Sequence, residues 1–213
     1  MIELINVTKS FDAQQVLKEL SLRFDEGELI VIKGKSGSGK STLLSLIAGL
    51  AKPTSGEIIV DGKHISKLPE HFCSSYRRDN IGMIFQKYNL IETLSVKENI
   101  LLPLVPLNLS EELLEKRVAE QMHTFNISHK ADELIKYLSG GEQQRTAIAR
   151  AHIADPKIIL ADEPTANLDE VLSKNFIEML EKMKSKNKTI IVATHDPLFF
   201  ELDFVDRIID FDS

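Results

Sequence analysis

The segment Gly34–Ser41 constrains this chain more than any other part of its sequence. It fits the pattern G-x-x-x-x-G-K-[ST], follows an apolar run at 29–32, and leads into a second apolar run at 43–50. This order predicts a strand, a glycine-rich loop and a helix. The glycines of such a loop let several backbone N–H groups point inward at phosphate, and the helix adds the positive end of its dipole. We therefore predict a site for a nucleoside phosphate.

The residues of this loop have distinct expected roles. The Lys40 ammonium would reach the β- and γ-phosphates, and the Ser41 hydroxyl would ligate Mg²⁺. A plain Gly/Ser turn would account for the glycines but not for the Lys-Ser ending in this context. A dinucleotide-type G-x-G-x-x-G does not fit, because no third glycine follows at the required place. The residues expected to bind the nucleotide here are Gly34, Ser36, Gly37, Ser38, Gly39, Lys40, Ser41 and Thr42.

A later apolar run ends in two carboxylates, since residues 158–161 are followed by Asp162 and Glu163. An acid at the end of a strand is the usual second anchor for Mg²⁺ in nucleoside triphosphatases, and we assign that role to Asp162. Glu163 would orient and deprotonate the attacking water as a general base. Two acids after a strand can also cap a helix, but the phosphate loop upstream favours the catalytic interpretation.

The segment Leu138–Gln143 has the sequence Leu-Ser-Gly-Gly-Glu-Gln. Ser139 and Glu142 fit a capping box at the start of a helix, and the two glycines between them free the backbone there. With this segment in place, the sequence resembles the ATP-binding subunits of ABC transporters. Their Leu-Ser-Gly-Gly-Gln motif is matched with Glu142 in place of the usual Gln.

This resemblance covers nearly the whole chain and implies roles for further residues. Taken singly, Phe11 could be a core aromatic, Gln86 a solvated loop residue, and His195 a capping or surface histidine. By its place in the family's order of motifs, Phe11 becomes an adenine platform and His195 a catalytic switch histidine. Gln86 becomes a Q-loop residue that contributes to catalysis and to the metal site. The resemblance also implies nucleotide contacts by Val16 and Asp169, the latter in a D-loop formed by Asn167, Leu168 and Asp169.

The resemblance further implies a head-to-tail pair of domains that sandwich two ATP molecules. The phosphate loop of one domain would face the Ser139, Gly140 and Gly141 segment of the other, so that this segment contacts the γ-phosphate in trans. Because the chain carries one set of motifs, we expect a homodimer on ATP binding or a pair with a related chain. The work would pass to an integral membrane permease through the surface around Gln86 and the helical lobe.

The fold class follows from the apolar pattern and the resemblance together. Helical spacing is clear at 114–125, 143–154 and 172–183, and Asp61-Gly62 predicts a hairpin turn. We expect an α/β protein, a P-loop NTPase of the ABC-ATPase type with an N-terminal antiparallel β subdomain and a helical subdomain. Short apolar runs suited to strands lie at 2–7, 20–24, 29–32, 58–60, 81–85, 158–161, 189–194 and 207–211.

We expect residues 1–213 to form one domain. Residues 1–91 and 155–213 would form the catalytic core with the β subdomain, and 92–154 the helical subdomain. The run 100–107 is apolar but contains two prolines, which is compatible either with a packed kink or with a docking patch for a partner.

Net charge and hydropathy limit the kinds of partner that the chain can have. The 26 Lys and Arg against 32 Asp and Glu give a net charge of -6, whereas nucleic-acid binders usually carry a basic excess, so we expect no nucleic acid. The longest uncharged stretch, 99–110, is too short to cross a bilayer and the first residues do not begin a signal peptide, so we expect no membrane insertion. We predict a cytoplasmic protein, peripheral on the inner face of the plasma membrane.

A narrower resemblance rests on residues 78–86, 89–91, 98–104 and 161–169. These segments are similar to the bacterial subfamily that drives lipoprotein release and macrolide or peptide export. They imply an ATP-hydrolysing subunit that drives a separate permease, of the export, lipoprotein-release or mechanotransmission type. The alternatives are an ATP-dependent scaffold or signalling ATPase of the cell-division type, an importer ATPase, and a soluble ATPase of DNA repair or translation.

Overall fold

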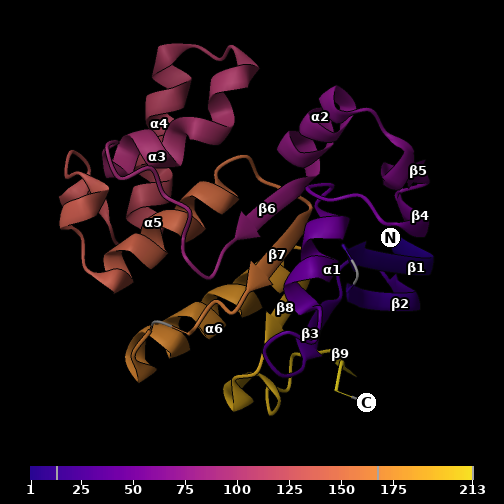
Figure 1. Ribbon diagram of the computed structural model, residues 1–213. Helices are drawn as coiled ribbons and strands as arrows, with labels where there is room; N and C mark the ends of the chain where they lie inside the picture. The colour runs from indigo at the N-terminus through magenta and orange to yellow at the C-terminus, as the bar shows by residue number, and fades with distance from the viewer. Residues whose placement is uncertain (13, 167, 213) are drawn as a thin grey trace.

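The computed structural model describes residues 1–12, 14–166 and 168–212, and builds them around two sheets (Figure 1). The first sheet is antiparallel, with strand order β2-β1-β4-β5. The second is parallel, with strand order β6-β7-β8-β3-β9. The first sheet consists of β1 (Ile2–Phe11), β2 (Gln14–Phe24), β4 (Ser55–Val60) and β5 (Lys63–His64). The second consists of β3 (Leu29–Lys33), β6 (Ile81–Ile84), β7 (Ile158–Asp162), β8 (Thr189–Thr194) and β9 (Arg207–Asp210).

The parallel sheet is covered on both faces, as its unbroken apolar strands predict. Leu29 and Val31 of β3 pack in one cluster with Phe176 and Leu180 of α6 (Glu170–Lys184). The alternate β3 residues pack in a second cluster with the apolar face of α1 (Lys40–Ile47) and with the antiparallel sheet. Because the strands are parallel, the carboxyl ends of β6, β7, β8 and β3 lie at one edge of the sheet. The segments that follow those four strands are therefore brought together.

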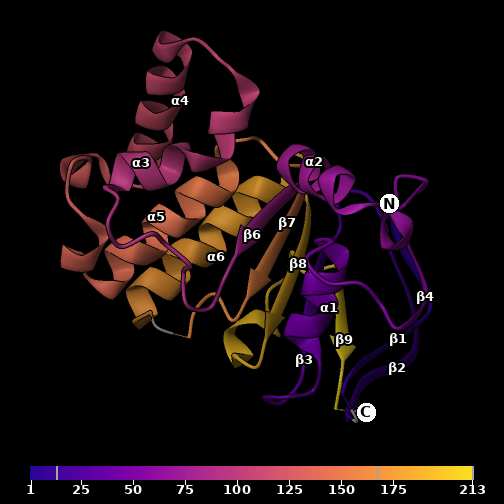
Figure 2. The same ribbon diagram turned by 45° about the horizontal axis from the view of Figure 1, so that its top comes forward.

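Three helices group on one side of the molecule, away from the antiparallel sheet (Figure 2). They are α3 (Val96–Leu101), α4 (Glu111–Thr124) and α5 (Gly140–His152). Short 3-10 turns cover Ile65–Lys67, Leu102–Leu107, Ser128–Lys130, Ile135–Tyr137 and Pro197–Phe199. α5 begins three residues before the predicted start at 143, because its N-cap is Ser139 and both glycines belong to its first turn. The limits of a helical subdomain at 92 and 154 stay a prediction.

The N-terminal part differs from its apolar pattern in two respects. β1 and β2 extend beyond the predicted runs at 2–7 and 20–24, because each gains an antiparallel partner for its polar residues as well. The helix α2 (Glu70–Asn80) was not predicted, because its sequence is polar; Cys73 and Tyr76 are its buried residues. Its position is fixed by tertiary bonds, such as the one from the Tyr76 hydroxyl to the Ile47 carbonyl at 2.9 Å.

One local prediction, that of the hairpin turn, is confirmed. Asp61 and Gly62 have φ of 47° and 75° and join β4 to β5 in a tight hairpin. In the proline-containing run, Ile100 and Leu104 are fully buried whereas the Val105 side chain is 58% exposed, so the run packs on one side only. No helix within the described residues is long and apolar enough to span a membrane.

Candidate functional site

The expected site residues that follow β3, β7 and β8 meet at the shared edge of the parallel sheet. The Ser41 hydroxyl, at the start of α1, donates to the Asp162 carboxylate at 2.9 Å. The Lys40 ammonium lies 3.5 Å from a carboxylate oxygen of Glu163, and Nδ1 of His195 lies 2.9 Å from the same oxygen. Residues more than 150 positions apart in sequence thus form one polar cluster.

Two glycines give the phosphate loop its shape. Gly37 and Gly39 have φ of 85° and 99°, in the left-handed region that side chains disfavour. A Cβ atom added to Gly39 would lie 2.8 Å from Leu17 Cδ2 and 3.2 Å from the Val16 carbonyl oxygen. Gly39 is therefore required both by the turn and by the approach of β2, whereas a Cβ atom on Gly37 would meet nothing within 4 Å.

The loop has the groups that a phosphate needs. Lys40 is 5% exposed, and its ammonium donates to the carbonyls of Gly34 (2.5 Å) and Lys35 (3.0 Å). The Ser38 hydroxyl is buried and has no hydrogen-bond partner within the described part of the chain. The first turn of α1 holds no acidic residue, so nothing opposes the helix dipole there. A buried cation, a free hydroxyl and a helix N-terminus together fit a phosphate group.

The pair Ser41 and Asp162 fits a divalent cation. Burial raises the pKa of the Asp162 carboxyl, the Ser41 hydrogen bond opposes that shift, and the neighbouring Glu163 charge adds to it. A cation beside a buried carboxylate would stabilise its charged form. No cluster of three or more His, Cys, Asp or Glu side chains that could hold a metal occurs among residues 1–12, 14–166 and 168–212. The remaining ligands of such a cation would have to be water and phosphate oxygens, as Mg²⁺ prefers.

Glu163 is held in a fixed orientation. Its φ is 45°, which is strained for a residue with a side chain, and its backbone N–H donates to the Ala193 carbonyl of β8 at 2.8 Å. One carboxylate oxygen accepts from the Thr194 hydroxyl at 3.0 Å and from the His195 N–H at 3.3 Å. The sequence reasoning missed Thr194, and the only signal for it was its position between a buried strand and His195.

The Ser139 segment is not brought to the phosphate loop within one chain. Ser139 caps α5: its hydroxyl and its N–H both donate to the Glu142 carboxylate at 2.8 Å, which confirms the predicted capping box. These two bonds also lower the pKa of Glu142. Ser139 and Gly140 are exposed, while a Cβ atom on Gly141 would lie 2.5 Å from Leu172 Cδ1 of α6. The helices α5 and α1 pack in the two different clusters on opposite faces of the parallel sheet (Figure 1).

The other predicted site residues lie on separate elements of the fold. Phe11 is 50% exposed with the Lys9 ammonium 4.6 Å from its ring centroid, and Val16 lies beside Gly39. Gln86 is exposed in the segment after β6. Asp169 caps α6 by accepting from the Leu172 N–H at 2.9 Å. The predicted D-loop residue Asn167 lies outside the described residues.

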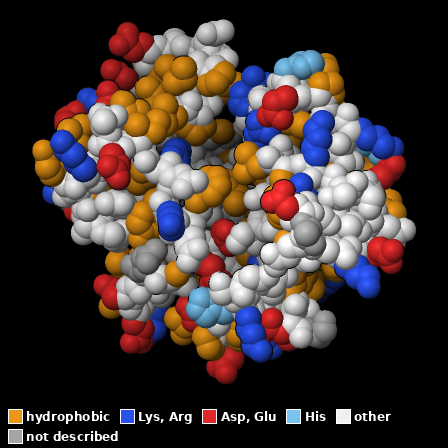
Figure 3. Space-filling view, in the orientation of Figure 1, with side chains coloured by type: hydrophobic (Ala, Val, Ile, Leu, Met, Phe, Trp, Pro, Cys, Tyr) orange, Lys and Arg blue, Asp and Glu red, His pale blue; other side chains and the backbone are white. Residues whose placement is uncertain are grey.

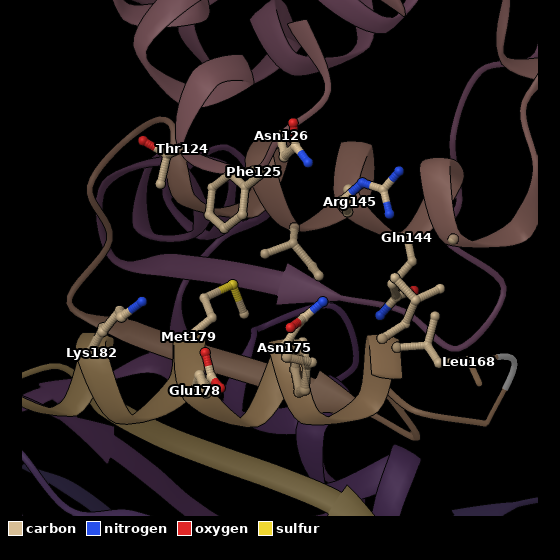
Figure 4. A pocket seen from close by; sticks show the side chains of 14 residues that line it. Thr124, Phe125, Asn126, Gln144, Arg145, Leu168, Asn175, Glu178, Met179 and Lys182 are labelled. Carbon is tan, nitrogen blue, oxygen red and sulfur yellow. The ribbon is translucent and has the colours of Figure 1, made fainter. Parts of the chain in front are cut away.

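A separate cavity of about 310 Å³ lies between α5 and α6 (Figure 4). Its lining includes Gly141, Arg145, Phe176 and Met179 but none of the phosphate-loop residues and neither acid of the polar cluster. This cavity is therefore distinct from the site that the strand ends form.

Comparisons with known proteins agree with this geometry. The family model described as ABC transporter matches residues 17–166. The macrolide export ATP-binding/permease protein MacB of Campylobacter jejuni is 40% identical over 197 residues, 92% of this chain and 31% of MacB. The bacitracin export ATP-binding protein BceA of Halalkalibacterium halodurans is 39% identical over 207 residues, 93% of this chain and 80% of BceA. This chain thus spans less than a third of the length of MacB but most of BceA.

A solved structure is equally similar. The ATP-binding cassette MJ0796, described as a bacterial ABC transporter cassette, matches with a TM-score of 0.92 and 40% identity, over 99% of this chain and 94% of that one. It was solved as a dimer in a post-hydrolysis state with ADP and Pi bound.

Proposed function

The chain belongs to the ABC transporter family and is an ATP-binding ATPase of that family, and on this premise we propose how it acts. It binds ATP at the edge of the parallel sheet, hydrolyses it in a dimer, and drives a separate membrane permease. The observation that carries the proposal is the cluster of Lys40, Ser41, Asp162, Glu163 and His195 at the ends of three strands.

The chain's own groups account for phosphate binding. The Lys40 ammonium, already held at the loop by two carbonyls, would turn toward the β- and γ-phosphates. The buried Ser38 hydroxyl and the first N–H groups of α1 supply further donors. Mg²⁺, when bound by Ser41 and Asp162, would neutralise part of the phosphate charge. Phe11 would stack on adenine from the exposed end of β1.

Glu163 is the proposed general base. Its carboxylate is oriented by Thr194 and by the backbone of His195, so it can hold a water molecule in one position. A proton taken from that water would remain on Glu163 or pass to the adjacent His195 imidazole, whose Nδ1 is 2.9 Å away. His195 is 67% exposed and would contact the γ-phosphate, while Gln86 would approach it from the end of β6.

We propose that the active form is a head-to-tail homodimer. Ser139 and Gly140 are exposed at the start of α5, away from the phosphate loop of the same chain. A second copy could therefore present this helix start to the γ-phosphate. The dimeric form of the similar cassette MJ0796 supports this arrangement.

The proposed permease contact is a groove of about 300 Å³ beside the Gln86 segment, visible as a hollow between the α3–α5 side and the α2 side (Figure 3). Arg150 of α5 donates to the carbonyls of Tyr88 and Asn89 at 2.6 Å, so the wall of this groove is bonded to the helix that Ser139 begins. A permease segment in the groove would then respond to movement of α5. The lining residues include Arg78, Met83, Phe85, Pro103, Pro106 and Arg150.

We propose an export or lipoprotein-release system at the cytoplasmic face of the membrane, on the basis of the similarity to MacB and BceA. The test is affinity purification of tagged Glu163→Gln chain from native membranes in mild detergent with ATP and Mg²⁺, followed by mass spectrometry. A co-purifying polytopic protein with an extracytoplasmic domain is expected. Recovery of the chain alone, or with ribosomal or DNA-bound proteins, would contradict a transport role, and a permease paired with a binding protein would indicate import.

A further inference from the structure

The segment after β9 reaches the beginning of the phosphate loop. β9 pairs in parallel with β3 and places Asp210 opposite Lys33. The Phe211 N–H then donates to the Lys33 carbonyl at 2.8 Å, and the Lys33 ammonium lies 3.1 Å from the Asp210 carboxylate. The sheet pairing therefore continues up to the residue before Gly34. Asp212, which follows Phe211, therefore lies beside the loop.

Asp212 bonds directly to the loop backbone. Both of its carboxylate oxygens accept from the Lys35 N–H, at 2.9 and 3.1 Å. Its own N–H donates to the Asp210 carboxylate at 2.9 Å, which fixes the turn that brings the Asp212 side chain to Lys35. A backbone N–H bonded to a carboxylate forms a stronger bond than one between neutral groups. The loop is thus tied to the edge strand of the sheet at its second residue.

The same residue faces the nucleotide machinery through its carbonyl group. Its carbonyl accepts from the Lys40 ammonium at 3.0 Å and from the Ser38 N–H at 3.2 Å. Gly34 is packed between the two segments, since a Cβ atom there would lie 2.7 Å from the Ser38 hydroxyl oxygen and 3.1 Å from Phe211 Cβ. A shift of Lys35 would therefore move the acceptor that orients Lys40.

We propose that Asp212 is a positioning residue for phosphate binding. It acts through Lys35: its carboxylate holds the Lys35 N–H, and the Lys35 carbonyl orients Lys40 and the turn at Ser38. The proposal rests on the phosphate-binding function proposed above for this loop. Asp212 itself need not touch the nucleotide, and its negative charge would by itself repel a triphosphate. Removal of Asp212 should therefore weaken nucleotide binding if its role is the hydrogen bond to Lys35, and strengthen it if its role is purely electrostatic.

The test compares Asp212→Ala and Asp212→Asn in the full chain, with Asp203→Ala as the matched control. Asp203 is an exposed acid of the same C-terminal region, so its removal changes the net charge equally. ADP and ATP affinities are measured by calorimetry with Mg²⁺, and KM and kcat by steady-state hydrolysis. Loss of the bond in Asp212→Ala should weaken both nucleotides about five- to tenfold and raise KM with little change in kcat. Asn keeps a carbonyl acceptor, so Asp212→Asn should bind within about twofold of the wild type.

Hydrogen exchange gives a direct readout of the bond. The peptide that contains Lys35 should exchange faster in Asp212→Ala than in Asp212→Asn or Asp203→Ala, while thermal unfolding of all three variants stays alike because Asp212 is exposed. Affinity in Asp212→Ala equal to that of the control, tighter binding, or an Asn variant as weak as the Ala variant would overturn the proposal. A wild-type chain that bound neither ADP nor ATP would instead contradict the proposed function itself.

Discussion

Two capping boxes of nearly the same geometry allow the trans role of Ser139 to be separated from its helix-capping role. At α3 the Ser95 N–H and hydroxyl donate to Glu98 at 2.7 and 2.8 Å, and the Glu98 N–H donates back at 3.3 Å. At α5 the corresponding distances for Ser139 and Glu142 are 2.8, 2.8 and 3.4 Å. Only the second box is expected to meet a nucleotide.

The stability cost of each Ser→Ala change follows from these distances. An N-cap Ser→Ala substitution costs about 0.5–2 kcal/mol, and both bonds to the backbone N–H exceed the typical length of about 2.9 Å, so the lower half of that range applies. In a chain of this size a loss of about 1 kcal/mol lowers Tm by roughly 2–4 °C. Ser139→Ala should therefore lower Tm by about that amount, and Ser95→Ala by at least as much, because Ser95 is buried whereas Ser139 is exposed.

Hydrolysis should distinguish the two variants. A hydrogen bond to a charged phosphate contributes about 1.5–3 kcal/mol, so Ser139→Ala should lose about ten- to a hundredfold in kcat/KM while Ser95→Ala keeps the wild-type value. Ser139→Asp should also lose hydrolysis through repulsion of the γ-phosphate, but its Tm should fall too, because its carboxylate would face the Glu142 carboxylate to which the Ser139 hydroxyl now donates at 2.8 Å. The assay is steady-state ATP hydrolysis beside thermal unfolding. Hydrolysis by Ser139→Ala equal to that of Ser95→Ala would refute the trans role.

Three further predictions concern the loop, the base and pH. Gly39→Ala should cost about 1–3 kcal/mol in backbone strain and should also displace the Leu17 side chain. A Cβ atom at Gly37 would meet nothing within 4 Å, so the chemical unfolding midpoint and the ADP affinity should be lower in Gly39→Ala than in Gly37→Ala. Equal losses in the two variants would contradict this packing. Glu163→Gln should lower kcat about 10²- to 10⁴-fold with ATP affinity retained in equilibrium binding, and undiminished turnover would exclude Glu163 as the base. Burial lowers the pKa of His152 in the folded chain. As the pH is lowered below about 6.5, the unfolded chain therefore takes up a proton more readily than the folded chain, and the free energy of unfolding should decrease. His152→Gln should flatten that dependence in denaturant titrations, and an unchanged slope would show that another group causes it.

The site residues within single sequence segments were predictable because local chemistry determines them. The order of strand, glycine-rich loop and Lys40-Ser41 requires no knowledge of the rest of the chain. The capping box at Ser139 and the hairpin at Asp61-Gly62 are likewise local, and the structure confirms both.

Contacts between distant segments were not predictable from the pattern. Thr194 bonds to Glu163 because β8 lies beside β7, and Asp212 bonds to Lys35 because β9 lies beside β3. No spacing in one sequence records that strand order. The polar helix α2 was missed for a related reason. It has no broad apolar face, and tertiary bonds such as the one from the Tyr76 hydroxyl hold it in position instead.

In the proposed dimer, each ATP is hydrolysed between the phosphate loop of one chain and the Ser139 segment of the other. The test of this arrangement is to mix two inactive variants. Lys40→Ala lacks a working phosphate loop, and Ser139→Arg lacks a working start of α5. A mixed dimer would contain one site built from two intact halves, so ATP hydrolysis should recover to at most about a quarter of the wild-type rate after random pairing. Hydrolysis that stays at the background of the separate variants at every mixing ratio would contradict the claim.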